Sequence, residues 1–244
     1  MAPLPLPLVL VPLLVLQASA STVGPSSEKN TTFDFDALTE PFGTKVSDDD
    51  PVHKLMPDPT KLEFHLPLKC SACGAVIEHT VRLFRPAIEK YKELAIRDGV
   101  TVDVRFREYE SVDVYEKLCG EVGRLYGLEV DDKKRPTLRF SRSLGVPRVQ
   151  GSWMPFFLSS TCEELVDDME ERLTEEVASA ATEDARTDKS KVLTFYPDKE
   201  IVEKVRQSIC TSWDRSSQGC DWKGLPIDPR SDGDIDDHDD RGSL

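Results

Sequence analysis

Residues 70–99 read CSACGAVIEHTVRLFRPAIEKYKELAIRDG. The apolar residues in this stretch recur at steps of three and four positions, which predicts an amphipathic helix that begins around Cys70 and stops at Asp98-Gly99. Pro86 lies inside the pattern, so a kink is expected there. Cys70 and Cys73 open the helix on or next to its apolar face, where a half-cystine can join it to a neighbouring helix across a core.

Three more helices are predicted downstream, again from apolar periodicity and capping signals. Ser111 can cap a second helix, with Gly127 as its C-terminal stop. A third helix is expected from about Ser160, because Ser160 and Glu163 have the spacing of a capping box. Asp198 opens the fourth helix. A cysteine lies within, or at the end of, each of these three helices: Cys119, Cys162 and Cys210.

The segments between the helices give weaker signals. Residues 100–107 alternate between apolar and polar, as in a half-buried strand or an extended connector. Residues 128–152 are rich in charged and turn-forming residues and are expected to be mostly loop, with a short extended candidate at Thr137–Phe140. Residues 178–191 suggest a frayed helix end or a connector. The predicted fold class is therefore mainly α: a disulfide-linked bundle of about four helices with a short extended insertion.

Two short motifs are candidates for surface function. Lys133-Lys134-Arg135 fits a processing site or a docking patch, although a solvated charged loop is the more common explanation of such a cluster. Residues 153–158, WMPFFL, form the densest aromatic and aliphatic run outside the predicted helices. If these side chains are exposed, the run is a docking site for a client or a chaperone. If they are buried, the run is a loop whose side chains pack into the core.

The two ends of the chain carry most of its acidity. The 244 residues have a net charge of −14, and residues 33–50 hold six acidic residues against one lysine. Residues 226–244 hold seven aspartates against two arginines. We divide the chain into a flexible acidic segment at 21–59, a folded domain at 60–223 and a disordered acidic tail at 224–244. An acidic chain is a poor ligand for nucleic acid, because it offers few cations to replace phosphate counterions.

The first 20 residues predict a signal peptide. Leu8–Leu16 is an apolar run of signal-peptide length, and Ala18-Ser19-Ala20 fits the cleavage site of a signal peptidase. The run is too short to span a bilayer, so stable membrane insertion is not expected. Asn30 begins an Asn-Thr-Thr sequon and is a candidate glycosylation site. These features predict entry into the secretory pathway.

Six cysteines in an oxidising compartment predict three disulfides. Fifteen pairings are possible, and the residues alone do not choose among them. The six, all within the predicted domain, are Cys70, Cys73, Cys119, Cys162, Cys210 and Cys220.

The cysteine pattern resembles the canopy family of saposin-like proteins of the endoplasmic reticulum. The resemblance covers roughly residues 61–222 and rests on the CxxC pair, YESVDVYEKLCGEVGRLYGLEV, SSTCEELVDDMEERL and VRQSICTSWDRSSQGC. It implies a saposin-like bundle with nested disulfides: Cys70–Cys220, Cys73–Cys210 and Cys119–Cys162. It also implies a co-chaperone that works with an endoplasmin-type chaperone on client proteins in the lumen. The chain ends Arg-Gly-Ser-Leu rather than in a KDEL-like retrieval signal, so secretion is the alternative to lumenal residence.

Two other functions remain open. Cys70 and Cys73 at a helix N-terminus could form the site of a thiol-disulfide oxidoreductase, because a helix dipole lowers the pKa of a thiol. Two structural half-cystines are the preferred interpretation, so no catalytic residue is assigned. A lipid-binding saposin is the third possibility.

No cofactor or metal site is predicted. The four histidines lack ligand spacing, which disfavours zinc. Asp232, Asp234 and Asp236 mimic the start of a calcium loop without its later glycine and glutamate, which favours a solvated tail.

Overall fold

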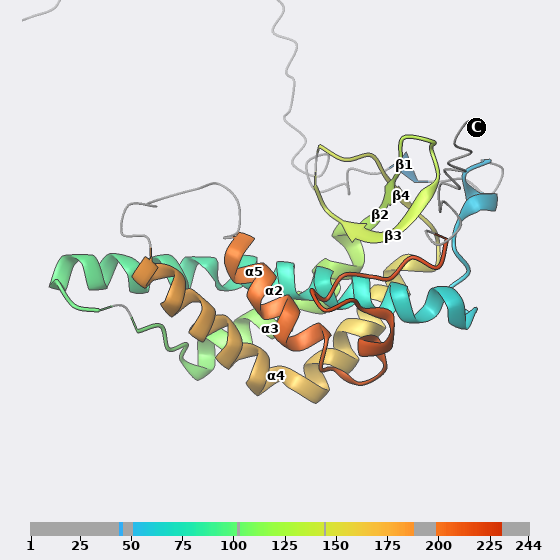
Figure 1. The fold of residues 1–244 in the computed structure, drawn as a ribbon. Helices are drawn as coiled ribbons and strands as arrows, with labels where there is room; N and C mark the ends of the chain where they lie inside the picture. The colour runs from blue at the N-terminus through green and yellow to red at the C-terminus, as the bar shows by residue number, and fades with distance from the viewer. Residues whose placement is uncertain (1–43, 46–50, 102, 144, 188–198, 231–244) are drawn as a thin grey trace, which may run out of the picture.

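The computed structural model describes residues 44–45, 51–101, 103–143, 145–187 and 199–230 (Figure 1). The predicted signal peptide, Asn30 and the three aspartates of the calcium-loop-like motif, Asp232, Asp234 and Asp236, lie outside these ranges. The described residues form four α-helices, two short 3-10 helices and a small sheet, which confirms the mainly α class. The helices are α2 (Leu62–Asp98), α3 (Glu108–Leu125), α4 (Met154–Thr187), α5 (Lys199–Cys210), η1 (His53–Leu55) and η2 (Asp214–Gly219).

Helix α2 begins eight residues earlier than the pattern predicts, at Leu62 rather than near Cys70. Pro67 obscures this start in the sequence, but a proline in the second turn removes only one hydrogen bond of the helix. The backbone carbonyl of Lys61 accepts the first helical bond, from the amide of His65 at 2.8 Å. At the other end, Gly99 has φ 65° and closes the helix in the left-handed conformation, so the predicted stop is confirmed.

Helices α3 and α4 also begin before their predicted caps. The backbone amide of Arg107 donates to the Glu110 carboxylate at 2.8 Å, so α3 starts at Glu108 and Ser111 lies inside it. Helix α4 starts at Met154, with Pro155 in its first turn, where a proline is tolerated. Ser160 is therefore an internal residue of α4 and does not cap it.

The C-terminal part of α4 is regular helix as far as Thr187. This corrects the expectation that residues 178–191 are a frayed end or a connector, for the part of them that the structure describes. Ala180 and Ala181 are buried there, so packing stabilises a stretch with weak periodicity.

Residues 128–152 contain more regular structure than the predicted loop, because about half of them lie in strands. The described residues form a four-stranded sheet in the order β1-β4-β2-β3, in which β2 is antiparallel to both β3 and β4 and β1 is parallel to β4. The extended candidate Thr137–Phe140 lies within β3. The strands are β1 (Thr44–Lys45), β2 (Gly127–Val130), β3 (Pro136–Ser141) and β4 (Arg148–Gln150).

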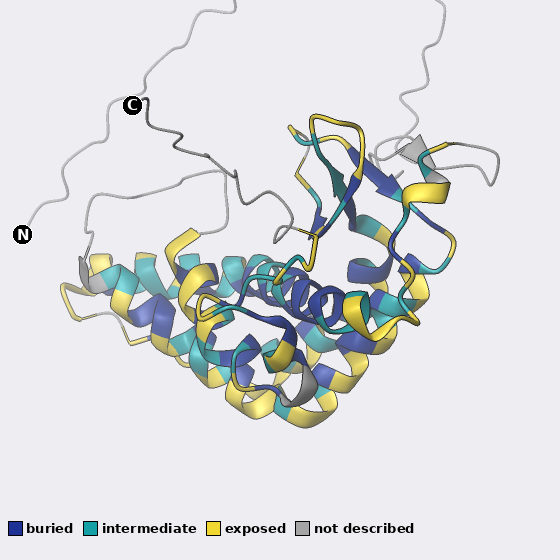
Figure 2. Ribbon diagram, turned by 45° about the vertical axis from the view of Figure 1, so that its right-hand side comes forward, coloured by how far each residue is buried: buried dark blue, intermediate teal, exposed yellow. Residues whose placement is uncertain are grey.

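Gly127 belongs to β2 and does not stop α3. A Cβ atom at this position would lie 2.8 Å from the backbone oxygen of Val149, so the close approach of β2 and β4 requires a glycine. The sheet packs on α2, where the Ser71 hydroxyl accepts a hydrogen bond from the amide of Phe140 at 2.7 Å. Figure 2 shows the buried residues on the sides of the helices and strands that face one another.

Residues 100–107 form an extended connector; no regular strand is found among those of them that are described. The packed structure also extends beyond the predicted domain boundaries. Val52 and Met56, in the predicted flexible segment, pack against the core. Arg230, in the predicted tail, donates to the backbone oxygen of Pro136 at 3.1 Å.

Candidate functional site: the disulfide seam

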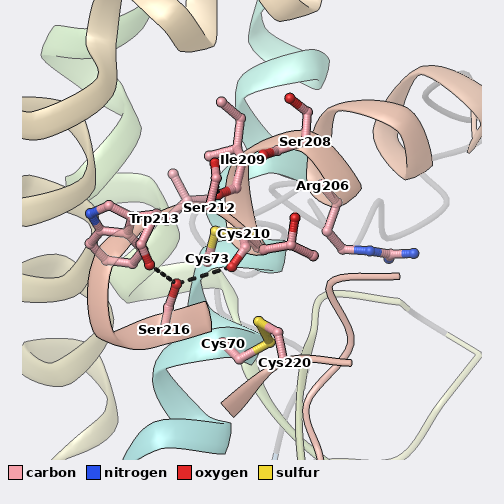
Figure 3. Close-up of a disulfide and its surroundings, with 12 residues drawn as sticks. Cys70, Cys73, Arg206, Ser208, Ile209, Cys210, Ser212, Trp213, Ser216 and Cys220 are labelled. Atoms are coloured by element: carbon pink, nitrogen blue, oxygen red, sulfur yellow. Dashed lines mark hydrogen bonds between the residues drawn. A yellow bond between two sulfur atoms is a disulfide. The ribbon is translucent and has the colours of Figure 1, made fainter. Parts of the chain in front are cut away.

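Three disulfides join the four helices and the segment after η2. Cys70 pairs with Cys220, Cys73 with Cys210 and Cys119 with Cys162, with Cα–Cα distances of 5.4, 5.9 and 5.3 Å. This is the nested pairing that the family resemblance implies. Figure 3 shows the two outer bonds side by side, one helical turn apart along α2. Helix α2 is therefore linked twice to the C-terminal part of the domain, once to α5 and once to the segment after η2.

Hydrogen bonds hold the loop after α5 in place beside these two bonds. The Ser216 hydroxyl donates to the backbone oxygens of Trp213 at 2.7 Å and of Cys210 at 3.2 Å (Figure 3). The buried Trp213 indole donates to the carboxylate of Asp168 in α4 at 3.1 Å. The ammonium of Lys69 lies 4.7 Å from the centroid of the Trp213 ring. The loop thus contacts both α2 and α4.

The CxxC pair is buried and fully engaged. Cys70 and Cys73 are both 0% exposed, and each is bonded to a cysteine outside α2. All six cysteines lie within the described ranges, and none of them is a free thiol. A reactive cysteine needs an accessible thiolate. In this oxidised state the disulfides crosslink the fold, and the CxxC pair presents no free thiol.

We expect the Cys73–Cys210 bond to be the last of the three to be reduced. An attacking thiolate must reach a sulfur atom. Both residues of this bond are 0% exposed, whereas Cys220 is 9% exposed and Cys119 is partly buried. Limited reduction, alkylation and peptide mass spectrometry would measure the order. Early labelling of Cys73 would contradict it and would favour a redox role for the CxxC pair.

A buried polar cluster lies where α2, α3 and the sheet meet. The Nε2 atom of His79 is 2.8 Å from the Glu121 carboxylate, and its Nδ1 atom is 3.0 Å from the guanidinium of Arg142. A guanidinium only donates hydrogen bonds, so Nδ1 is the acceptor and the proton resides on Nε2. His79 is therefore held in its neutral form. Glu78, Arg82 and Tyr126 are the other titratable groups around it.

The environment of this cluster shifts two pKa values in opposite directions. Burial lowers the pKa of His79, and the positive charges of Arg142 and Arg82 lower it further, against the opposing hydrogen bond to Glu121. Burial raises the pKa of Glu78, against the effect of nearby Arg82 and Arg142. Hence burial shifts each pKa in the direction that favours the neutral form, relative to the same group in water.

We expect the protein to lose stability as the pH falls below about 6.5, the usual pKa of histidine, toward the lower pKa of folded His79. In that range the unfolded chain binds a proton at His79 that the folded chain excludes. His79→Gln keeps one donor and one acceptor but cannot titrate, so its urea unfolding should depend less steeply on pH. The raised pKa of Glu78 changes stability with pH in the opposite direction. It does so equally in the parent protein and in His79→Gln, so its effect cancels when the two are compared. Parallel pH profiles would contradict the role of His79.

The predicted docking run, residues 153–158, lies at the start of α4 and is partly buried and partly exposed. Met154 and Leu158 are 0% exposed, while Phe156 is 80% exposed. Lys133-Lys134-Arg135 forms the exposed turn between β2 and β3, where Lys134 has φ 58°. The amide of Asp131 donates to the backbone oxygen of Arg135 at 2.9 Å, so the turn is closed.

The described residues contain no group of three or more His, Cys, Asp or Glu side chains arranged to hold a metal ion. In the same part of the chain, no helix combines the length and the apolar character required to cross a bilayer.

The four helices and the three disulfide bonds form a mainly helical, crosslinked domain. Such crosslinks are typical of chains that fold in an oxidising compartment. Comparison with known protein families, with curated proteins and with solved structures finds no match to this chain.

Proposed function

We propose that this chain is a canopy-type folding helper of the secretory pathway, which binds client proteins or an endoplasmin-type chaperone by surface contact. The cysteine pattern, the predicted signal peptide and the mainly helical fold support this proposal. Its expected place of action is the lumen of the endoplasmic reticulum, with secretion as the alternative.

The observation that carries the proposal is the engagement of both CxxC cysteines in buried bonds to other elements. A thiol-disulfide oxidoreductase needs one of these sulfur atoms at the surface. Binding by contact needs only a stable scaffold with accessible side chains, and several large apolar side chains are exposed here, among them Phe156, Leu62 and Trp222.

Refolding of reduced, denatured lysozyme in the presence of the intact oxidised protein separates these functions. A folding helper lowers light scattering in proportion to its own concentration and leaves the rate of thiol loss from the client unchanged. An oxidoreductase accelerates thiol loss when present in substoichiometric amounts. If the protein changes neither quantity, folding assistance is refuted for a general client. Co-sedimentation with liposomes at neutral and acidic pH tests the lipid-binding alternative, which bound protein would support.

A further inference from the structure

An open groove of about 670 Å³ runs between the connector that follows α2 and the last turns of α4. Its volume lies within the range of about 300–1,000 Å³ that is usual for ligand sites. Hydroxyl and carboxylate groups contribute much of the lining, together with a few apolar side chains. The lining residues are Asp103, Val104, Arg105, Phe106, Thr174, Glu175, Ala178, Ser179, Thr182 and Glu183.

The connector wall of the groove is anchored to the core. The side chain of Val104 is buried, and the ring of Phe106 stacks on Phe84 with a centroid distance of 4.1 Å. The amide of Val104 donates to Thr182 Oγ1 in α4 at 2.9 Å. On the other side, the backbone oxygen of Arg105 accepts a bond from the Tyr91 hydroxyl in α2 at 2.5 Å. This wall is therefore formed before any ligand binds.

These two bonds also show which way the backbone faces. In an extended chain the backbone polar groups of successive residues point to opposite sides, so those of Val104 and Phe106 face α4 and those of Arg105 face α2. The carbonyl of Val104 and the amide of Phe106 consequently lie along the groove. Neither has a hydrogen-bond partner within the described ranges. A donor and an acceptor spaced in this way can pair with an added strand.

The α4 side of the groove is acidic. Glu183 on α4 is paired with Lys204 at 3.0 Å, whereas Asp103 lies on the opposite, connector wall and is paired with Arg105 at 3.0 Å. The Glu175 carboxylate, also on α4, has no hydrogen bond or ion pair with any residue that the structure describes. An unpaired carboxylate beside an open backbone edge favours a ligand with a cationic side chain. The hydroxyls of Thr174, Ser179 and Thr182 make the same groove a poor site for an acyl chain.

We propose that this groove binds an extended polypeptide segment that carries a lysine or arginine, pairs with the backbone of Val104 and Phe106, and places its cation at Glu175. This inference rests on the proposed function, because unfolded clients expose such segments. It deepens that function by naming the class of ligand and the surface that binds it.

Fluorescence anisotropy of the intact protein with a short labelled peptide of alternating threonine, valine and lysine tests the proposal. Glu175→Gln should weaken binding about two- to fivefold, as expected for the loss of one exposed ion pair. Glu171→Gln, one turn away on α4 and outside the groove lining, is the matched control and should bind normally. N-methylation of alternate peptide residues should weaken binding about tenfold or more, because it blocks backbone pairing.

Hydrogen exchange gives an independent readout, since bound peptide should protect the amide of Phe106. Equal binding by the parent protein and Glu175→Gln, together with an unprotected Phe106, would overturn the groove as the site. A loss of binding in Phe156→Ser alone would move the site to the start of α4. If the refolding assay succeeds while these peptide tests fail, the folding function stands and only the groove is refuted.

Discussion

Removing both outer disulfides is expected to unfold the domain, whereas removing either one alone is expected to leave it folded but weakened. The variants are Cys70→Ala with Cys220→Ala, Cys73→Ala with Cys210→Ala, and all four together. The two bonds lie one turn apart on α2 and meet the same C-terminal region, so each partly replaces the other.

Loop entropy explains the redundancy. Either bond alone closes a loop of well over a hundred residues, with sequence separations of 150 and 137, which is worth about 5 kcal/mol in the chain-entropy model. Once one is closed, the second closes only a ring of about 13 residues, formed by 70–73 and 210–220, and adds about 3 kcal/mol. Together they contribute about 8 kcal/mol, comparable to the whole stability of an ordinary domain of about 5–15 kcal/mol.

Removal of the inner bond, Cys119–Cys162, can be compared directly with removal of either outer bond. Its sequence separation is only 43, but no other disulfide lies close to it along the chain. Its loss should cost about 4 kcal/mol, more than the loss of either outer bond alone. Urea unfolding of the three pairwise variants, followed by the fluorescence of buried Trp213, measures this order. A larger loss for either single outer bond would contradict the redundancy.

Gly123→Ala and Gly120→Ala are expected to change stability in opposite directions, although both lie in α3. At Gly123 an added Cβ would lie 2.3 Å from the Ser159 hydroxyl oxygen and 2.9 Å from the backbone oxygen of Pro155 in α4. The serine can rotate but the backbone cannot, so α3 and α4 must separate. Overpacking of this kind costs about 1–3 kcal/mol.

Gly120 is the matched control, because it is exposed and an added Cβ would meet nothing within 4 Å. Alanine is the better helix former by about 1 kcal/mol, so Gly120→Ala should raise stability. Thermal unfolding of the oxidised variants tests both changes. A stabilised Gly123→Ala would show that α3 and α4 do not approach as closely as the structure has them.

The helical segments were largely predictable because apolar periodicity over many residues is a local signal. The first residues of the helices were harder to predict. Pro67 and Pro155 resemble breaks in the sequence, and only packing shows that the helices include them. The sheet was missed because its strands are two to six residues long and contain charged residues such as Glu129 and Arg139. Short strands are stabilised by their partners and have little local signature.

Some features of the candidate site were likewise predictable from the sequence, and others were not. Its six cysteines are evident from composition and their even number predicts disulfides, but the burial of the CxxC pair depends on which elements pack over it. The His79 cluster had no sequence signal, because Glu121 and Arg142 lie 42 and 63 residues away from His79 in the chain. Only one wall of the groove had a sequence signal, which was the alternation of apolar and polar residues over 100–107.

By itself the sequence determined the helical class, the stop of α2 at Gly99 and the supply of six cysteines, because these follow from residue types and short spacings. Tertiary structure alone decided the sheet, the neutral state of His79 and the groove between the connector and α4. Each of these requires residues far apart in the chain to come within a few ångströms, and such proximity is created only when the whole domain packs.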